Sequence, residues 1–481
     1  MNVRMLGYLF GIIMTIEAAL LLLPLVTAAA FGESVLPFLY TIALLLGLAI
    51  PLILLRPRKD RRFFAREGFV CAAGTWILLS LFGALPFLFS GAIPHYVDAV
   101  FETVSGFTTT GASILREVES LPRGILLWRS LTHWVGGMGV LVFMLAILPA
   151  DNSRAMYLLR AEVPGPTKGK IVPRLRETAK ILYGIYLGLT ALELVALLFA
   201  GLPFYDALVN SLATAGTGGF SVLNSSIAGY GSPAVEWVIA VFMFLFGINF
   251  NLYFFLLLGR VRDILRSEEF RAYLTVTAVA TLVILLNTLS LYRGFGEALR
   301  TAFFQVTSVM STTGFATVDF NAAWPTLSKA VLLTLLVIGA SAGSTAGGLK
   351  LSRVIILAKN AMREVKHLLR PRSVNVTRLD GEALPEETVR ATSNYLTLYF
   401  GIFLLSALLI SVDGHTVETT LTASLTCLNN VGPGLGAVGP AGNFADFSVF
   451  SKLVLSFEML IGRLEIIPLL IFFSPSTWRR A

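Results

Sequence analysis

The sequence predicts an all-α integral membrane protein made of four pseudo-symmetric repeats that follow an extra N-terminal pair of helices. The 481 residues are 56% hydrophobic and 14% charged, and their mean hydropathy is +0.77. A chain of this length has too few polar residues to cover a water-soluble globule. In addition, residues 98–113, DAVFETVSGFTTTGAS, return in altered form at 206–221, 301–316 and 419–434. Their spacing is too long and irregular for a solenoid, so each repeat must contain further structure.

Two apolar segments open the chain, at about residues 5–30 and 36–55. Each is long enough to cross about 30 Å of hydrocarbon. The first is too long for the apolar core of a signal peptide, so we expect it to be retained. Residues 56–62, RPRKDRR, follow the second segment, and the positive-inside rule places them in the cytoplasm. Residues 1–62 are therefore expected to form a transmembrane helix pair outside the repeats.

Each repeat is expected to contain a crossing helix, a short segment and a second crossing helix. The crossing helices are predicted at 68–89 and 124–150, 179–200 and 233–258, 271–289 and 326–357, and 393–412 and 447–473. The four pore repeats then span residues 63–153, 154–259, 260–358 and 393–481, and a cytoplasmic loop at 359–392 precedes the last. Lys and Arg gather in the loops between repeats, so ten crossings leave these loops and both termini in the cytoplasm.

The short segment of each repeat is too short to cross a membrane. An aspartate at its start in two copies, Asp98 and Asp206, indicates a capped half-helix that enters the membrane and turns back. Its non-helical end must face protein or water, because unpaired backbone groups cannot face lipid. Glu102, Asn210 and Gln305 share one position in these half-helices and are expected to brace the ends from behind. Four such ends in one chain indicate a shared axis.

The ends of the half-helices carry threonine and glycine, with glycine recurring at positions 111, 219, 314 and 432. These residues offer carbonyl and hydroxyl oxygens that can replace the hydration shell of a cation. The C-termini of the half-helices carry partial negative charge and are expected to point at the same place. The pattern therefore predicts a cation site on the shared axis.

Two further features of the sequence are unusual for membrane helices. Residues 339–350 read GASAGSTAGGLK, and this glycine content is expected to open the second helix of the third repeat, although small residues also permit close helix packing. Arg463 stands in an apolar stretch, where an arginine normally faces a cavity or a partner.

In the loop before the last repeat, residues 373–384 alternate apolar and polar residues around Asp380 and Gly381. This pattern predicts a cytoplasmic β-hairpin and a docking element, with a plain solvated loop as the alternative.

The chain resembles the Trk/Ktr/HKT potassium transporters, in which one chain carries four helix–pore-helix–helix units like those of a tetrameric potassium channel. The resemblance covers nearly the whole sequence and is closest to the Trk-type translocating subunits, because of the extra N-terminal helix pair. The motifs that carry it are TTTGAS, TGGFS, STTGFA and NNVGPG at the four half-helix ends, with HWVGGMG from His133, GSTAGGLK from Gly343 and GRLEIIP from Gly462.

The resemblance implies a potassium filter at the half-helix ends and a gate below it. A glycine at position 111, where some sodium-preferring relatives carry serine, favours potassium. The implied filter residues are Thr109, Thr110, Gly111, Gly218, Gly219, Thr312, Thr313, Gly314, Asn430, Val431 and Gly432. The implied gate residues are Gly343, Ser344, Thr345, Ala346, Gly347, Gly348 and Arg463.

By the same resemblance, the chain is expected to be a homodimer that takes up potassium across a bacterial-type cytoplasmic (inner) membrane. Its expected partner is a cytoplasmic nucleotide-binding regulatory subunit of the Trk or Ktr kind. The nucleotide is expected on that partner and no cofactor in this chain, which has no P-loop or GxGxxG fingerprint. Less selective sodium/potassium transport and secondary ion-coupled transport remain as alternatives. The sequence shows no nucleophile or metal constellation of an enzyme, and its basic loops indicate orientation, not nucleic acid.

Overall fold

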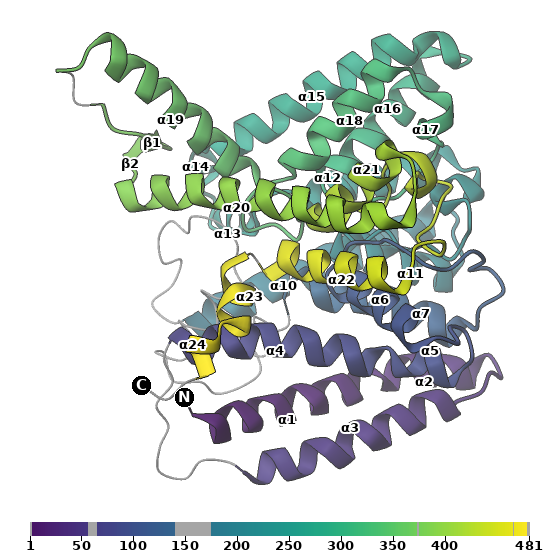
Figure 1. The fold of residues 1–481 in the computed structure, drawn as a ribbon. Helices are drawn as coiled ribbons and strands as arrows, with labels where there is room; N and C mark the ends of the chain where they lie inside the picture. The colour runs from purple at the N-terminus through teal and green to yellow at the C-terminus, as the bar shows by residue number, and fades with distance from the viewer. Residues whose placement is uncertain (1, 56–64, 140–174, 373–374, 465, 479–481) are drawn as a thin grey trace.

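The computed structural model describes residues 2–55, 65–139, 175–372, 375–464 and 466–478. Its long helices run roughly parallel, and the start of α1 lies at the same end of the bundle as α24 (Figure 1). The prediction of an all-α membrane fold is confirmed. The basic residues 56–62, most of the loop between the first two repeats, and Arg479 and Arg480 lie outside the described residues.

The N-terminal helix pair is a hairpin. Helices α1 (Val3–Leu20) and α2 (Leu22–Ala30) run one way and α3 (Leu36–Leu54) returns. Gly11 lets α1 and α3 approach closely, because a Cβ there would lie 3.0 Å from the carbonyl oxygen of Ala49. Helix α1 also packs on α4 (Ala65–Gly83), and α2 packs on α7 (Arg123–Gly137). The pair is therefore joined to the first repeat.

Six helices of the described segments are long and apolar enough to cross a membrane. They are the two of the N-terminal pair and the first helix of every repeat. Those first helices are α4 with its extension α5 (Leu85–Phe89), α10 (Leu175–Phe199), α15 (Glu268–Thr288) and α20 (Glu386–Ile410). The half-helices are α6 (Tyr96–Phe107), α11 (Phe204–Gly216), α16 (Phe295–Met310) and α21 (Val417–Asn429).

The second helices join the repeats into a ring. They are α7, α12 (Pro233–Phe246), α18 (Thr326–Ile338) and α22 (Val449–Leu464). Each packs against the half-helix of the next repeat: α7 on α11, α12 on α16, α18 on α21, and α22 on α6. The last contact brings the fourth repeat back to the first, so the half-helices surround one axis.

Two predicted second helices are wrong in length. The helix expected at 233–258 ends at Phe246, and α13 (Phe250–Leu257) leaves it at an angle of 91°. Asn249 starts the new helix because its side chain accepts a hydrogen bond of 3.0 Å from the Asn251 N–H. The helix expected at 124–150 ends at Gly137, and Gly139 follows in a left-handed conformation with φ of 80°. Its predicted remainder, residues 140–150, lies outside the described residues.

The second helix of the third repeat is open where glycine is concentrated. Helix α18 ends at Ile338, α19 (Leu351–Leu369) begins at Leu351, and residues 339–350 between them form no helix. We call residues 339–350 the intramembrane loop. The remaining short elements are α14 (Val261–Arg266), α17 (Phe320–Ala323), α23 (Ile466–Phe473), α24 (Pro475–Trp478), η1 (Ser226–Tyr230), η2 (Leu289–Leu291), η3 (Ser411–Asp413) and η4 (Gly436–Val438).

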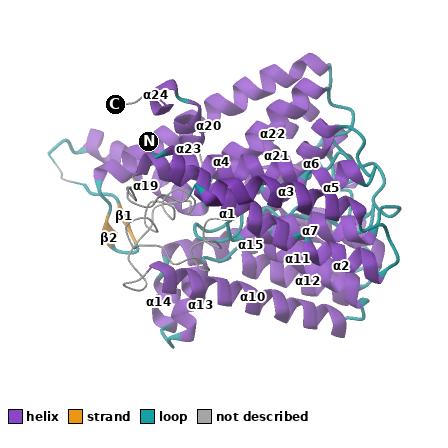
Figure 2. Cartoon of the chain, turned by 90° about the horizontal axis from the view of Figure 1, so that it is seen from below, coloured by secondary structure: helices purple, strands orange, loops and turns teal. Residues whose placement is uncertain are grey.

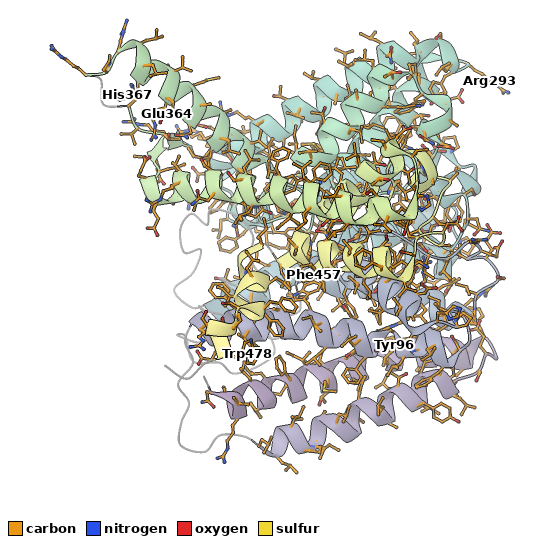
Figure 3. All side chains as sticks on the ribbon, viewed as in Figure 1. Tyr96, Arg293, Glu364, His367, Phe457 and Trp478 are labelled. Atoms are coloured by element: carbon orange, nitrogen blue, oxygen red, sulfur yellow. The ribbon has the colours of Figure 1, made fainter. Side chains whose placement is uncertain are left out.

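The predicted β-hairpin is present and lies beside α19 (Figure 2). Strands β1 (Arg378–Leu379) and β2 (Glu382–Ala383) pair antiparallel. Asp380 and Gly381 between them both have positive φ, 52° and 82°, which is the conformation of a two-residue hairpin turn. In Figure 3, Glu364 and His367 of α19 lie at the end of the molecule that carries Trp478, and Arg293, just before half-helix α16, lies at the other end. The hairpin thus lies far from the start of half-helix α16 (Figure 1).

Candidate functional site

All four half-helices end in the same backbone conformation. The residue two positions before each recurring glycine is left-handed: Thr109, Thr217, Thr312 and Asn430 have φ of 57°, 57°, 59° and 55°. The next N–H in each copy then reaches back five residues, in the bonds Thr110 N to Ser105 O (2.9 Å), Gly218 N to Ala213 O (3.0 Å), Thr313 N to Ser308 O (2.8 Å) and Val431 N to Thr426 O (2.9 Å). This is the helix-ending pattern in which a left-handed residue satisfies the last carbonyls. A non-glycine residue rarely adopts this conformation, so its fourfold recurrence shows that the repeats share one local structure.

The recurring glycines bring the four ends into contact. A Cβ added to Gly111 would lie 2.1 Å from the carbonyl oxygen of Gly218, and one added to Gly219 would lie 2.1 Å from that of Thr313. In the same way, a Cβ on Gly314 would lie 3.1 Å from the Gly432 nitrogen.

The ring closes through its fourth member, because a Cβ on Gly432 would lie 2.9 Å from the Gly111 carbonyl oxygen. Gly111, Gly219 and Gly314 have φ of 79°, 77° and 86°. Gly432 differs, since it is not among the described glycines with positive φ. We call these four glycines and their neighbours the glycine ring.

A cavity of about 190 Å³ opens above the glycine ring, on the side of the loops that follow the half-helices. All four glycines line it, together with Arg129 and Ser221 behind them. The backbone of all four repeats therefore faces one cavity. Such a space allows non-helical backbone at membrane depth.

A buried ion pair supports the part of the glycine ring that the first repeat contributes. Glu102 of α6 is fully buried and lies 2.8 Å from the guanidinium of Arg129 on α7. The carboxylate also accepts hydrogen bonds from the Ser113 hydroxyl (3.0 Å) and the Ile114 N–H (3.0 Å), just beyond Gly111. Arg129 stacks at 4.0 Å over the ring of Phe220, next to Gly219. A carboxylate in this position fixes the chain beyond the glycine without adding net charge.

The equivalent positions of the other repeats make weaker contacts. Asn210 donates to the Tyr230 hydroxyl (2.9 Å), and Gln305 donates to the Thr317 hydroxyl (3.3 Å). Ala423 stands at this position in the fourth repeat and has no polar side chain. At this one position the polar contact is strongest in the first repeat, and the alanine of the fourth repeat makes none.

His133 fills the space between the first two ends. Its Nδ1 lies 2.8 Å from the Gly106 carbonyl oxygen, and its Nε2 lies 3.3 Å from the Phe220 nitrogen. A Cβ on Gly218 would lie 2.1 Å from the imidazole ring. Gly218, an expected filter residue, is therefore required by packing against His133.

The intramembrane loop lies against the inner side of the glycine ring. The Gly347 N–H donates to the Thr312 hydroxyl (2.7 Å), and the Gly348 N–H donates to the Asn429 carbonyl (3.0 Å). Both acceptors belong to half-helix ends, in the third and fourth repeats. The loop is thus in direct contact with the parts of the glycine ring that the third and fourth repeats contribute.

Arg463 of α22 connects the loop to the first repeat. Its guanidinium donates to the Thr345 carbonyl (2.7 Å) and to the Gly137 carbonyl (2.6 Å), and it also bonds the Gly136 carbonyl. Gly136 and Gly137 end α7, and the C-terminus of a helix is a favourable place for a cation. One side chain therefore joins the loop to the end of α7.

The space below the loop is small and lined by basic side chains. A cavity of about 10 Å³ is lined by Lys350 at the end of the loop and by Arg353 and Arg463, and it has room for about one water molecule. Three positive charges around so small a space oppose the passage of a cation.

The expected site residues separate into those that meet at the axis and those that do not. The structure brings the four glycines together, and it brings residues 345–348 and Arg463 to the inner side of the ring. Gly343 and Ser344 contact other parts: the Gly343 carbonyl accepts from Phe250 N–H (2.9 Å), and the Ser344 hydroxyl donates to the Ser341 carbonyl (2.6 Å). Gly343 thus lies at the bend of the second repeat, whereas Ser344 bonds within the intramembrane loop itself.

Sequence reasoning missed Glu269, which contacts both ends of the intramembrane loop. A glutamate at the start of an apolar helix is usually explained by the helix dipole. No local signal in the sequence distinguishes it.

Comparison with known proteins gives one consistent result. Residues 39–480 match the TrkH family, which is described as "Cation transport protein". The chain is 39% identical over 489 residues to the "Trk system potassium uptake protein TrkH" of Salmonella typhimurium and 38% identical to that of Escherichia coli, with 100% of each chain covered. It also resembles the crystal structure of the potassium transporter TrkH from Vibrio parahaemolyticus, with a TM-score of 0.89, 34% identity and 100% of both chains covered.

Proposed function

The chain belongs to the TrkH family of cation transport proteins, and from this premise we propose that it takes up potassium through the glycine ring. The relatives that it matches over their full length are named potassium uptake proteins. The observation that carries the proposal is the closure of the ring, in which the backbone of each repeat packs against the next around one cavity.

The expected filter residues are Thr109, Thr110, Gly111, Gly218, Gly219, Thr312, Thr313, Gly314, Asn430, Val431 and Gly432. Carbonyl oxygens in such a ring replace the water molecules around a potassium ion. The C-termini of α6, α11, α16 and α21 add partial negative charge there. The fourth quarter departs from the rest, because Asn430 replaces threonine and Gly432 lacks the positive φ of its counterparts. This departure favours a less selective sodium/potassium transporter as the second candidate.

Reconstitution into liposomes tests the proposal. Gradients of potassium, rubidium, sodium and lithium imposed in turn should give fast flux of potassium and rubidium and slower flux of sodium and lithium. Equal flux of potassium and sodium would favour the second candidate. No flux of any of the four ions, from protein that is folded and inserted, would overturn both.

The intramembrane loop and Arg463 are proposed to close the path on the inner side of the ring. The loop contacts two half-helix ends, and Arg463 ties it to α7. An ion that leaves the ring inward meets the backbone of residues 345–348 and then the basic cavity beneath it. We therefore place the gate at the loop.

The protein is a membrane protein, and we place it in the cytoplasmic membrane with both termini in the cytoplasm. The same arrangement puts the β-hairpin in the cytoplasm, at the end of the molecule opposite Arg293. We propose that two copies of this chain form a homodimer. We also propose that the homodimer binds a cytoplasmic nucleotide-binding regulatory subunit, since the relatives are named as parts of a Trk system. The repeat boundaries given by the sequence remain our proposed division of the chain.

The β-hairpin is the proposed docking element for that subunit. Deleting residues 374–382 is expected to lower recovery of the nucleotide-binding subunit in a pull-down by about tenfold or more, because the exposed strand edge is lost. The membrane part should still elute as a folded species, since Leu379 contributes only to a small satellite cluster with Ile356 and Val389. Recovery equal to that of the unchanged chain would place docking elsewhere.

A further inference from the structure

Glu269 holds the two ends of the intramembrane loop together. It lies in the first turn of α15, and one of its carboxylate oxygens accepts a hydrogen bond from the Ala342 N–H (2.7 Å) and another from the Ser352 N–H (3.2 Å). Ala342 lies near the start of the loop and Ser352 just after its end. The side chain is 9% exposed. One buried carboxylate thus brackets the whole segment.

The bond to Ser352 also caps a helix. Ser352 is the second residue of α19, whose first N–H groups have no partner within the helix. The residue before the helix, Lys350, has a positive φ of 72° and directs its ammonium to the Ala346 carbonyl. Glu269 therefore supplies from a neighbouring helix the negative group that a helix N-terminus favours. The start of α19 and the fold of the loop depend on the same carboxylate.

The residue next to Glu269 is tied to the β-hairpin. The Glu268 N–H donates to the carboxylate of Asp380 (2.7 Å), in the hairpin turn. The Glu268 carboxylate forms an ion pair with Lys359 of α19, and the Lys359 ammonium donates to the Arg378 carbonyl (2.9 Å). The hairpin turn thus contacts the backbone one residue away from the group that brackets the loop.

We propose that Glu269 is the positioning residue of the intramembrane loop, and that the β-hairpin acts on the loop through Asp380 and the N-terminus of α15. The role of this link in transport rests on the proposed function. A partner that pulls on the hairpin turn would move the start of α15, and Glu269 with it. Since both loop ends bond the same carboxylate, a shift of that group releases them together.

The test uses two readouts in the full-length protein. The first is the rate at which a maleimide labels a cysteine introduced by Ser344→Cys, with the unsubstituted parent, whose Cys71 and Cys427 are buried, as the blank. The second is rubidium flux in liposomes without a partner subunit. Glu269→Ala is expected to raise both by about tenfold, because charge-assisted hydrogen bonds are lost at both loop ends. Glu269→Gln, which keeps one acceptor oxygen, should give a smaller rise.

Asp380→Ala should also raise the labelling rate and the rubidium flux. The variant with both Asp380→Ala and Glu269→Ala should exceed Glu269→Ala only slightly, since the effects of substitutions at coupled residues do not add. Glu387→Ala is the matched control: it removes an exposed carboxylate from the first turn of α20 and should change neither readout. Wild-type labelling in Glu269→Ala and Glu269→Gln would overturn the positioning role, and additive effects of Asp380→Ala would overturn the link.

The labelling readout does not depend on conduction. If no variant conducts any ion but Glu269→Ala labels faster, the proposed function fails and the positioning role stands. If all variants conduct potassium but substitution of Glu269 changes neither the labelling rate nor the flux, the positioning role is overturned and the proposed function stands. Should Glu269→Ala not fold, Glu269→Gln decides the question.

Discussion

Potassium flux is expected to fall by about tenfold or more when Gly111 is replaced by serine, and to fall further than sodium flux. The added Cβ would lie 2.1 Å from the carbonyl oxygen of Gly218, well inside van der Waals contact. That carbonyl must move, and it belongs to the neighbouring repeat of the glycine ring. Displacing one oxygen distorts the cage fitted to the larger ion. Relative fluxes in liposomes under matched potassium and sodium gradients measure the effect.

Two further variants identify its cause. Gly111→Ala carries the same Cβ without the hydroxyl, so an equal loss would assign the effect to crowding rather than to a new ligand. Gly91→Ser is the matched control for backbone strain: Gly91 has φ of 74°, close to the 79° of Gly111, but nothing lies within 4 Å of its Cβ position. Its flux should stay near that of the unchanged chain. Unchanged relative fluxes in Gly111→Ser would remove Gly111 from the filter.

Much of the fold can be predicted from the sequence because the same short pattern recurs four times. Glycine follows all four half-helices and threonine follows the first three, because each end requires a left-handed residue two positions before the glycine. In the fourth repeat Asn430 meets that need, and asparagine tolerates this conformation better than most residues. Asn430 therefore departs in sequence but keeps the local structure of Thr109.

Other features could not be predicted because they depend on contacts between distant segments. The bend after Phe246 arises where the Phe250 N–H bonds the Gly343 carbonyl of another repeat. The sequence at 233–258 is long and predominantly apolar, with Asn249 and Asn251 within it, and this pattern alone predicts one continuous crossing helix. The role of Glu269 could not be predicted for the same reason, since its two hydrogen-bond partners lie more than seventy residues away in the sequence.

The order of the ring is also a property of packing. Gly111 meets the second repeat and Gly432 meets the first, and this follows from each second helix packing on the next half-helix. Periodicity within a helix identifies an apolar surface but not its neighbour. The four expected glycines were therefore predictable as a set, whereas their order around the axis was not.

Ion flux measured without a partner subunit is expected to rise by about tenfold or more when Arg463 is replaced by alanine. The guanidinium bonds the Thr345 carbonyl on the loop and the Gly136 and Gly137 carbonyls at the end of α7. Alanine removes the guanidinium donor from all three carbonyls and takes one of three basic groups away from the small cavity below the loop. Both changes favour a cation in the path. Rubidium uptake into liposomes measures the rise.

Arg463→Lys separates the two causes. Lysine keeps the positive charge, but its ammonium lacks the planar fork that reaches carbonyls on two different elements. Flux near that of Arg463→Ala would show that the bonded fork closes the path, and flux near that of the unchanged chain would assign closure to charge. We expect the first result, because the three carbonyls come from both the loop and α7.

Deleting residues 345–347 should raise flux as well, since it removes the Thr345 carbonyl and the Gly347 N–H that bonds Thr312 (2.7 Å). Arg260→Ala is the matched control, because Arg260 is an exposed arginine paired with Asp263 at the start of α14. Its loss removes the same charge without touching the loop, so its flux should equal that of the unchanged chain. If Arg463→Ala and the deletion both fold and insert but conduct no faster than the unchanged chain, the constriction does not lie at the loop.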